Sequence, residues 1–286
     1  MSKVNKFLQN EVASLNDFLF MVEAYEEIAA LRMRKVKSSV LARRNFMHGL
    51  NDAFAYIVYA YRIYRKSIVK TLGEDTILNT NGKTVSVFLA SNTGLYGDII
   101  RDVFNLFAAE VSKVDTDVVI VGRLGRSMYD NYLNHKDYTF FEISDTGVDQ
   151  VNIKKLLESL TDYSSVVMYH SVFKSVLKQE AQKTWVTGEV LKIAESLENH
   201  KVGLFFEPSV AKIAEYFEKQ ILSLLFEQTV FESSLGKFAA RMISLDASAA
   251  NIHQKLSYYS FALQKSKHKA LNSNMQGTLA GGFLWN

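Results

Sequence analysis

The stretch VKSSVLARRNFMHGLNDAFAYIVYAYRIYRKSI, residues 36–68, decides the fold because its apolar side chains recur at alternating steps of three and four. The series runs through Val36, Val40, Arg43, Met47, Leu50, Phe54, Ile57, Tyr61, Tyr64 and Ile68. A spacing that averages about 3.5 residues keeps one seam of an α-helix facing a partner helix and gives a left-handed supercoil. The pattern therefore predicts a long coiled-coil helix.

The same step occurs upstream, at Leu8, Val12, Leu15, Leu19 and Val22. Residues 2–70 contain a single glycine, Gly49, and no proline. A nearly continuous helix of roughly 100 Å is therefore possible at about 1.5 Å per residue. We expect an N-terminal shaft helix within residues 1–72.

A second seam of the same spacing runs from Phe217 to Leu263, and after a slip in phase apolar residues continue at steps of four through Leu271, Met275 and Leu279. The chain's one proline, Pro208, suits a first helical turn, where its missing N–H would be unpaired anyway. We expect a C-terminal shaft helix over residues 208–286. The two helices would pair through a seam that includes Val36, Val40, Leu50, Phe54, Met242, Leu245, Ile252 and Leu256.

Residues 84–206 have a different pattern, in which short β-branched runs alternate with helical stretches. We expect strands at 84–90, 117–122, 138–142 and 165–170, and helices at 95–113, 124–135 and 151–161. Such alternation is typical of a largely parallel sheet. The predicted fold is α/β, with two long terminal helices that form an antiparallel coiled coil and an inserted Rossmann-like α/β domain at 84–206.

Composition excludes several classes of site and partner. The chain has no Cys, which excludes disulfides, zinc-thiolate sites, iron–sulfur clusters and cysteine nucleophiles. It has 33 Lys and Arg against 30 Asp and Glu, too even a balance to predict a nucleic-acid partner. No apolar run reaches the ~18 residues that a membrane span needs. We therefore expect an intracellular chain without a nucleic-acid partner.

Motifs for nucleotide and metal chemistry are incomplete. The tripeptide GKT at 82–84 resembles the end of a P-loop, but Ile77 stands where the first glycine is required. The segment GLYG at 94–97 lacks the third glycine of a dinucleotide-binding turn. The six histidines form no pair at the i, i+4 spacing that favours metal ligation on a helix. We therefore expect no catalytic, cofactor-binding or metal-binding residues, and no cofactor.

A basic run formed by Arg32, Arg34 and Lys35, and extended by Lys37, Arg43 and Arg44, lies on the N-terminal helix without acidic residues nearby. A solvated helical face would explain such a run. An acidic protein partner is the second explanation, and nucleic acid is the third.

Motifs spread along the chain resemble the γ subunit of F-type ATP synthases. The segment MVEAYEEIAALRMRKV at 21–36 is similar to that family's N-terminal pattern I-T-x-A-M-x-M-V-A-A-S-K-M-R-K-A. SNTGLYG at 91–97 resembles S-D-R-G-L-C-G, and GRLGR at 122–126 resembles G-R-K-G-R. FEPS at 206–209 matches the family's F-E-P-S.

The resemblance continues in order to the C-terminal helix. Its most specific part is Glu232-Ser233, then Ala239-Ala240-Arg241-Met242, then Asn251. The last part is Lys265, Lys267, His268, Leu271, Met275, Leu279 and Gly281, over the family's N-K-x-R-Q-A-x-I-T-x-E-I-x-E-I-V-x-G.

Membership of this family would imply a rotor. The terminal helices would form the central shaft inside a ring of α and β subunits, coupling rotation to ATP synthesis or hydrolysis at that ring. The chain would be a non-catalytic subunit of the complex. Its α/β domain would lie beside an ε-like subunit and a ring of c subunits, so the chain would be cytoplasmic and would meet the membrane only through the complex.

The resemblance also implies which residues touch the ring. Family positions that match the two basic stretches face acidic or polar loops on β, which implies rotor–stator contacts by Arg32, Arg34, Lys35, Lys265, Lys267 and His268. Antiparallel pairing of the shaft helices would bring the two stretches to neighbouring levels. The chain departs from the family at Lys267-His268, where an Arg-Gln pair is usual, and at Asn92-Thr93, where Asp and Arg are usual.

Three alternatives remain open. A composition rich in Lys, Asn, Tyr and Phe suggests an AT-rich bacterial genome, such as that of a mollicute. The chain would then be the rotor of a specialised F-type-like ATPase for motility or transport, not coupled to proton flow. A stand-alone coiled-coil scaffold would explain the seams but not the sheet. A nucleotide-using α/β enzyme would need a phosphate loop that the sequence lacks.

Overall fold

A computed structural model describes residues 3–68, 81–132, 137–145, 150–186 and 210–283 of the chain. These residues form two compact units. Unit 1 combines residues 1–30 with 241–286, and unit 2 spans residues 31–240.

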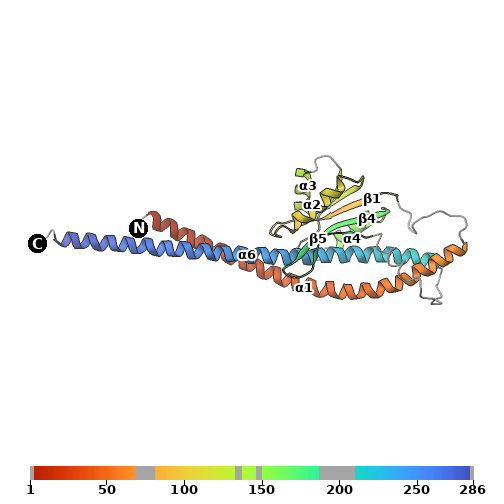
Figure 1. Ribbon diagram of the computed structural model, residues 1–286, viewed down its shortest axis with the longest axis horizontal. Helices are drawn as coiled ribbons and strands as arrows, with labels where there is room; N and C mark the ends of the chain where they lie inside the picture. The colour runs from red at the N-terminus through yellow and green to blue at the C-terminus, as the bar shows by residue number, and fades with distance from the viewer. Residues whose placement is uncertain (1–2, 69–80, 133–136, 146–149, 187–209, 284–286) are drawn as a thin grey trace. The chain divides into compact units, whose positions relative to one another are not determined.

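Two long helices run through the terminal parts of the sequence (Figure 1). Helix α1 covers Lys3–Ile68 and helix α6 covers Val210–Phe283, with 66 and 74 residues. Neither contains a proline, so every residue has a backbone N–H for the hydrogen bonds of the helix. Helices of this length confirm the predicted long terminal helices.

A five-stranded sheet occupies the middle of the chain. Its strands are β1 (Thr84–Leu89), β2 (Asp117–Val121), β3 (Tyr138–Phe141), β4 (Ser165–Phe173) and β5 (Gln179–Trp185), in the spatial order β3-β2-β1-β4-β5. The first four are parallel, and β5 pairs antiparallel with β4. The parallel strands confirm the predicted α/β class.

Strand β5 is the element that the sequence analysis missed. Its sequence, QEAQKTW, has no apolar alternation, because it is an edge strand in which no side chain is fully buried. A tight turn places it beside β4, with the Lys174 amide donating to the Lys178 carbonyl at 3.2 Å. Only the pairing partner, and not local composition, makes this segment a strand.

Three shorter helices connect the parallel strands. They are α2 (Ile99–Val111), α3 (Arg123–Tyr132) and α4 (Gln150–Leu160). Helix α2 begins at Ile99 and not at the predicted residue 95. Leu95 and Gly97 have φ values of 69° and 57°, and this left-handed backbone cannot continue into a helix.

Alternate residues of the strands build two apolar layers, one on each face of the sheet. Phe88 and Tyr169 pack with Phe104 and Phe107 of α2 on one face. The opposite face packs against α4 and α6, and the side chains buried there include Val87, Met168, Leu156 and Phe226. The sheet of unit 2 therefore holds a segment of α6 as part of its own core.

Close backbone approach fixes that segment of α6 on the sheet. The Ser171 hydroxyl on β4 donates to the Ser233 carbonyl at 3.0 Å, and Lys237 donates to the Ala90 carbonyl at the end of β1 at 2.8 Å. A Cβ at Gly236 would lie 3.0 Å from the Ser171 Oγ, so the glycine permits this approach. The helix and the sheet are thus joined by polar contacts as well as by apolar packing.

His170 is a buried titratable side chain of unit 2. It lies buried between β4 and β5, where Nδ1–H donates to the Ser171 carbonyl at 3.2 Å and Nε2 accepts from the Thr184 hydroxyl at 2.9 Å. Burial lowers the pKa of His170 to about 4, although the Ser171 carbonyl and Glu232 oppose this shift. The folded chain therefore holds the neutral imidazole at pH values where the unfolded chain would protonate it.

We expect the stability contributed by His170 to be complete above about pH 6.5 and to fall as the pH drops toward 4, by about 2 kcal/mol at pH 5. Melting temperatures at pH 7.5 and pH 5.0 test this for the native chain and for His170→Gln. The variant should lose less stability between the two pH values. An equal loss in both proteins would show that His170 does not cause the acid sensitivity.

Candidate functional site

The carboxyl ends of β1 and β2 carry the loops that bind phosphates in many parallel α/β sheets. Here the chain's own carboxylate occupies the loop after β1. Asp145 Oδ2 accepts from the amides of Asn92 and Thr93 at 2.8 and 3.0 Å, and from the Thr93 hydroxyl at 3.1 Å. These donors are therefore already satisfied by Asp145.

Asn92 and Gly122 tie this loop to the start of α3. The Asn92 side chain donates to the Ile143 carbonyl at 2.7 Å and accepts from the Arg123 amide at 3.1 Å. A carboxylate at residue 92 could accept but not donate, so the amide suits this position. Gly122 has φ of 97°, and a Cβ there would lie 2.6 Å from the Ser91 backbone.

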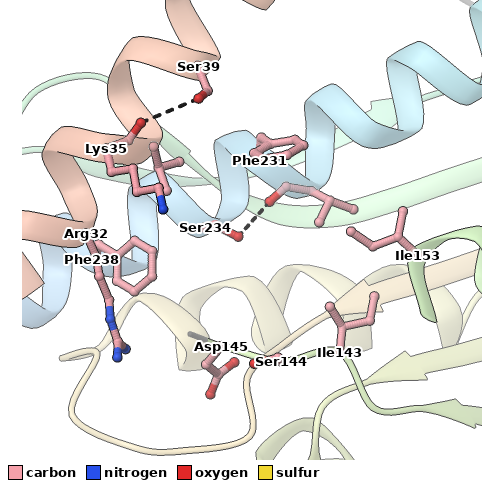
Figure 2. Close-up of a pocket in the computed structure, with 12 residues that line it drawn as sticks. Arg32, Lys35, Ser39, Ile143, Ser144, Asp145, Ile153, Phe231, Ser234 and Phe238 are labelled. Carbon is pink, nitrogen blue, oxygen red and sulfur yellow. Dashed lines mark hydrogen bonds between the residues drawn. The ribbon is translucent and has the colours of Figure 1, made fainter. Parts of the chain in front are cut away.

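A cavity of about 130 Å³ lies within unit 2, where the basic run of α1 faces α6 and the loop after β3 (Figure 2). Its lining comes from three separate parts of the sequence. These residues are Arg32, Lys35, Val36, Ser39, Ile143, Ser144, Asp145, Ile153, Val230, Phe231, Ser234 and Phe238. In Figure 2 the side chain of Arg32 extends from α1 toward the loop that carries Ser144 and Asp145.

The basic residues of α1 differ in how they are neutralised. Arg43 pairs with Glu227 at 2.8 Å, and Arg44 pairs with Glu232 at 2.8 Å. Among the residues that the structure describes, Arg32 and Lys35 form no ion pair. Two uncompensated cations of this region therefore lie at the cavity.

The predicted seam residues have different degrees of burial. Val40 and Leu245 are almost fully buried, whereas Val36, Met242, Ile252 and Leu256 are half-buried. The side chains of Leu50 and Phe54 lie outside the described part of the structure. A contact between Glu23 and His253, at 3.7 Å, joins the two helices of unit 1.

That contact corrects one sequence expectation. Leu271, Met275 and Leu279 were expected to continue the C-terminal seam, but they are exposed. Helix α1 begins at Lys3, so with Glu23 beside His253 an antiparallel partner ends near the level of Leu271. Within the residues that the structure describes, α1 does not cover the apolar side chains beyond that level.

The two predicted basic stretches do not meet within one unit. Arg32, Arg34 and Lys35 belong to unit 2, whereas Lys265, Lys267 and His268 belong to unit 1. Arg34 and the three residues of α6 are exposed. The expectation that antiparallel pairing brings the two stretches to neighbouring levels involves both units and stays a prediction.

Unit 1 exposes large apolar side chains that the periodicity analysis did not identify. Phe20 is 74% exposed, Tyr258 is 70% exposed and Phe261 is 67% exposed, and Phe7, Phe18, Met21 and Tyr25 are exposed as well. These residues fall outside the series with alternating steps of three and four. Large apolar residues outside that series are the sequence signal from which this exposed surface could have been predicted. Large exposed apolar surface marks a protein or membrane contact.

Two kinds of site are absent from the described residues. No helix among them is apolar over a long enough stretch to cross a bilayer. Within the same ranges, no group of three or more His, Asp or Glu side chains is arranged to hold a metal ion.

Comparison with known proteins gives consistent matches along the chain. The family model described as ATP synthase matches residues 5–276. The ATP synthase gamma chain of Legionella pneumophila strain Corby is 20% identical over 292 residues, covering 96% of this chain and 97% of the relative. The gamma chain of Delftia acidovorans is 21% identical over 294 residues, with the same coverage.

Solved structures show the same fold. The rotor of the Euglena gracilis mitochondrial ATP synthase matches with a TM-score of 0.64 and 12% identity, over 94% of this chain and 99% of that chain. The central stalk and c-ring structure of the Tetrahymena thermophila enzyme matches with a TM-score of 0.55 and 15% identity, over 80% and 99%. Both likenesses extend over nearly the whole length of the matched chain.

Proposed function

Because the chain belongs to the ATP synthase γ-chain family, we propose that its two long helices form the rotating central shaft of an F-type rotary ATPase. The nucleotide sites lie on the surrounding ring of α and β subunits, and this chain contributes no catalytic residue. Its α/β domain faces an ε-like subunit and a c ring. The chain is then cytoplasmic and peripheral to the membrane through the complex.

The observation that carries the proposal is the surface of unit 1. Its helices bury one stripe of side chains and still expose large apolar residues, of which Phe20 and Phe261 are examples. An isolated coiled coil would expose charged and polar residues there. Enclosure of the shaft by a ring removes these side chains from water, which favours assembly.

The shaft acts by asymmetry. A rod that contacts each ring subunit differently stabilises a different conformation in each, and each conformation has its own nucleotide affinity. Rotation of the rod then moves every subunit through these conformations in turn. Helices without proline suit this task because their backbone hydrogen bonds are continuous.

Asp145 argues against the nucleotide-enzyme alternative. Its carboxylate uses the amide donors of Asn92 and Thr93, which a bound phosphate would otherwise need. A phosphate placed there would also meet the negative charge of Asp145. The α/β domain is therefore better suited to holding the shaft than to binding a nucleotide.

The basic residues are the proposed electrostatic contacts with the ring. Arg32, Arg34 and Lys35 on α1 and Lys265, Lys267 and His268 on α6 would meet acidic or polar loops on β. Four of these cations are exposed, so salt and solvent screen their interactions with charges on the ring. They are Arg34, Lys35, Lys265 and Lys267. Each such contact contributes about 0–1 kcal/mol.

We expect single neutralising substitutions to change the ATP hydrolysis rate only modestly. Replacing Arg32, Arg34, Lys35 and Lys267 together by Gln should uncouple hydrolysis from rotation while the complex stays assembled, because the weak contacts act jointly. Rotation and hydrolysis are measured on the same assembled complex. A matched control replaces Lys154, Lys174, Lys178 and Arg101, which lie on the α/β domain, by Gln. Full torque in the shaft variant would show that the shaft drives β by shape alone.

A further inference from the structure

The cavity between α1, α6 and the loop after β3 combines an apolar wall with uncompensated positive charge. We propose that it binds a small organic anion whose carboxylate meets Arg32 and Lys35 and whose apolar body, about the size of one six-membered ring, enters among Ile143, Phe231 and Phe238. This ligand site is additional to the proposed rotor function.

The volume of the cavity limits the size of the apolar group that a ligand can place in it. Its volume is about 130 Å³. An apolar protein cavity of about 150 Å³ is large enough to hold benzene. A single aromatic or aliphatic ring therefore fits, whereas a nucleotide or a long acyl chain does not.

The wall of the cavity is built for an apolar group. Ile143, Ile153, Phe231 and Phe238 line it and are all buried. In Figure 2 the Phe231 ring and the two isoleucines lie around the same space. Aromatic side chains at such a site contact a ligand ring edge-to-face or offset-stacked.

The positive charge at the cavity favours an anionic ligand over an uncharged ligand of the same shape. Arg32 and Lys35 are its two cationic lining residues, and no carboxylate of the described chain pairs with either. Asp145 is the one acidic lining residue, and its Oδ2 already accepts three hydrogen bonds from Asn92 and Thr93. The lining therefore carries an excess of one positive charge, and Arg32 offers a planar fork of donors to a carboxylate.

Benzoate is the direct probe, because its ring matches the cavity and its carboxylate matches the two cations. We expect benzoate to bind saturably to the purified full-length chain in calorimetric titration. Benzyl alcohol, which keeps the ring and lacks the charge, should bind at least tenfold more weakly. Acetate, which keeps the charge and lacks the ring, should show the same loss. Equal binding of benzoate and benzyl alcohol would contradict the role of the cations.

Two variants separate charge from shape. Arg32→Gln combined with Lys35→Gln should weaken benzoate binding at least tenfold, while binding of benzyl alcohol stays unchanged. Ser234→Leu fills the cavity from α6 and should abolish binding of both probes without changing any charge. Lys37→Gln, which removes an exposed cation of α1 outside the cavity lining, is the matched control and should bind benzoate as the native chain does.

A second measurement keeps the proposal testable if a variant fails to fold. Crystals soaked with 4-bromobenzoate should show anomalous scattering from bromine between Phe231 and Phe238. Bromine found only elsewhere, or the absence of saturable benzoate binding, would overturn the site. Because the titration uses the chain without the ring of α and β subunits, a negative result leaves the proposed rotor function untouched.

Discussion

Replacing Gly122 by alanine is expected to destabilise unit 2 severely, by about 3–5 kcal/mol, because two costs combine at this position. Gly122 has φ of 97°, which L residues rarely adopt, and an added Cβ would lie 2.6 Å from the carbonyl carbon and oxygen of Ser91. Those atoms belong to the backbone and cannot rotate away. Chemical unfolding of the full-length chain, followed by circular dichroism, measures the loss.

Gly82→Ala is the matched control for that variant. Gly82 also has a positive φ, 74°, but nothing lies within 4 Å of the position that a Cβ would take. It should therefore show the conformational cost alone, about 1–2 kcal/mol. Equal losses in the two variants would mean that the close approach to Ser91 does not constrain the strand–helix turn.

Leu245→Asp has the second large expected effect. Leu245 is 3% exposed and lies in unit 1, so the variant would place a carboxylate at a buried position. Burying such a charge without a partner costs several kcal/mol, on the order of 3–5. We expect lower helical content and loss of assembly with the ring subunits.

Ala250→Asp provides the comparison on the same helix. Ala250 is exposed, so the same side chain should cost about 0.7 kcal/mol, the difference in helix propensity. Circular dichroism and co-purification are measured for both variants. If Leu245→Asp matched Ala250→Asp in both readouts, the buried seam would not hold the two helices together.

The long helices and the parallel sheet could be predicted because their signals are local. Three–four spacing without proline specifies the helices, and β-branched runs separated by helical stretches specify strands β1 to β4. Strand β5 could not be predicted, since its polar sequence becomes a strand only beside β4. The start of α2 depends on the backbone at Leu95 and Gly97, which the amphipathic pattern does not report.

The basic residues of the cavity could be predicted from the sequence, but the cavity itself could not. The run of basic residues at 32–35 is evident in the sequence, and the structure places Arg32 and Lys35 at a cavity. The other walls come from Ile143 and Phe231, more than a hundred and nearly two hundred residues away. Asp145 likewise reaches the loop at Asn92 only through the fold. No local pattern reports such contacts.

The proposed rotor function is tested most directly by measuring the rotation of this chain in the assembled complex. A reporter attached to the α/β domain, in a complex whose α and β subunits are fixed to a surface, should rotate in one direction when ATP is added and stop when ATP is removed. The rotation rate should follow the hydrolysis rate. Steady hydrolysis with a stationary chain, or hydrolysis that is unchanged when the chain is left out of the complex, would contradict the account.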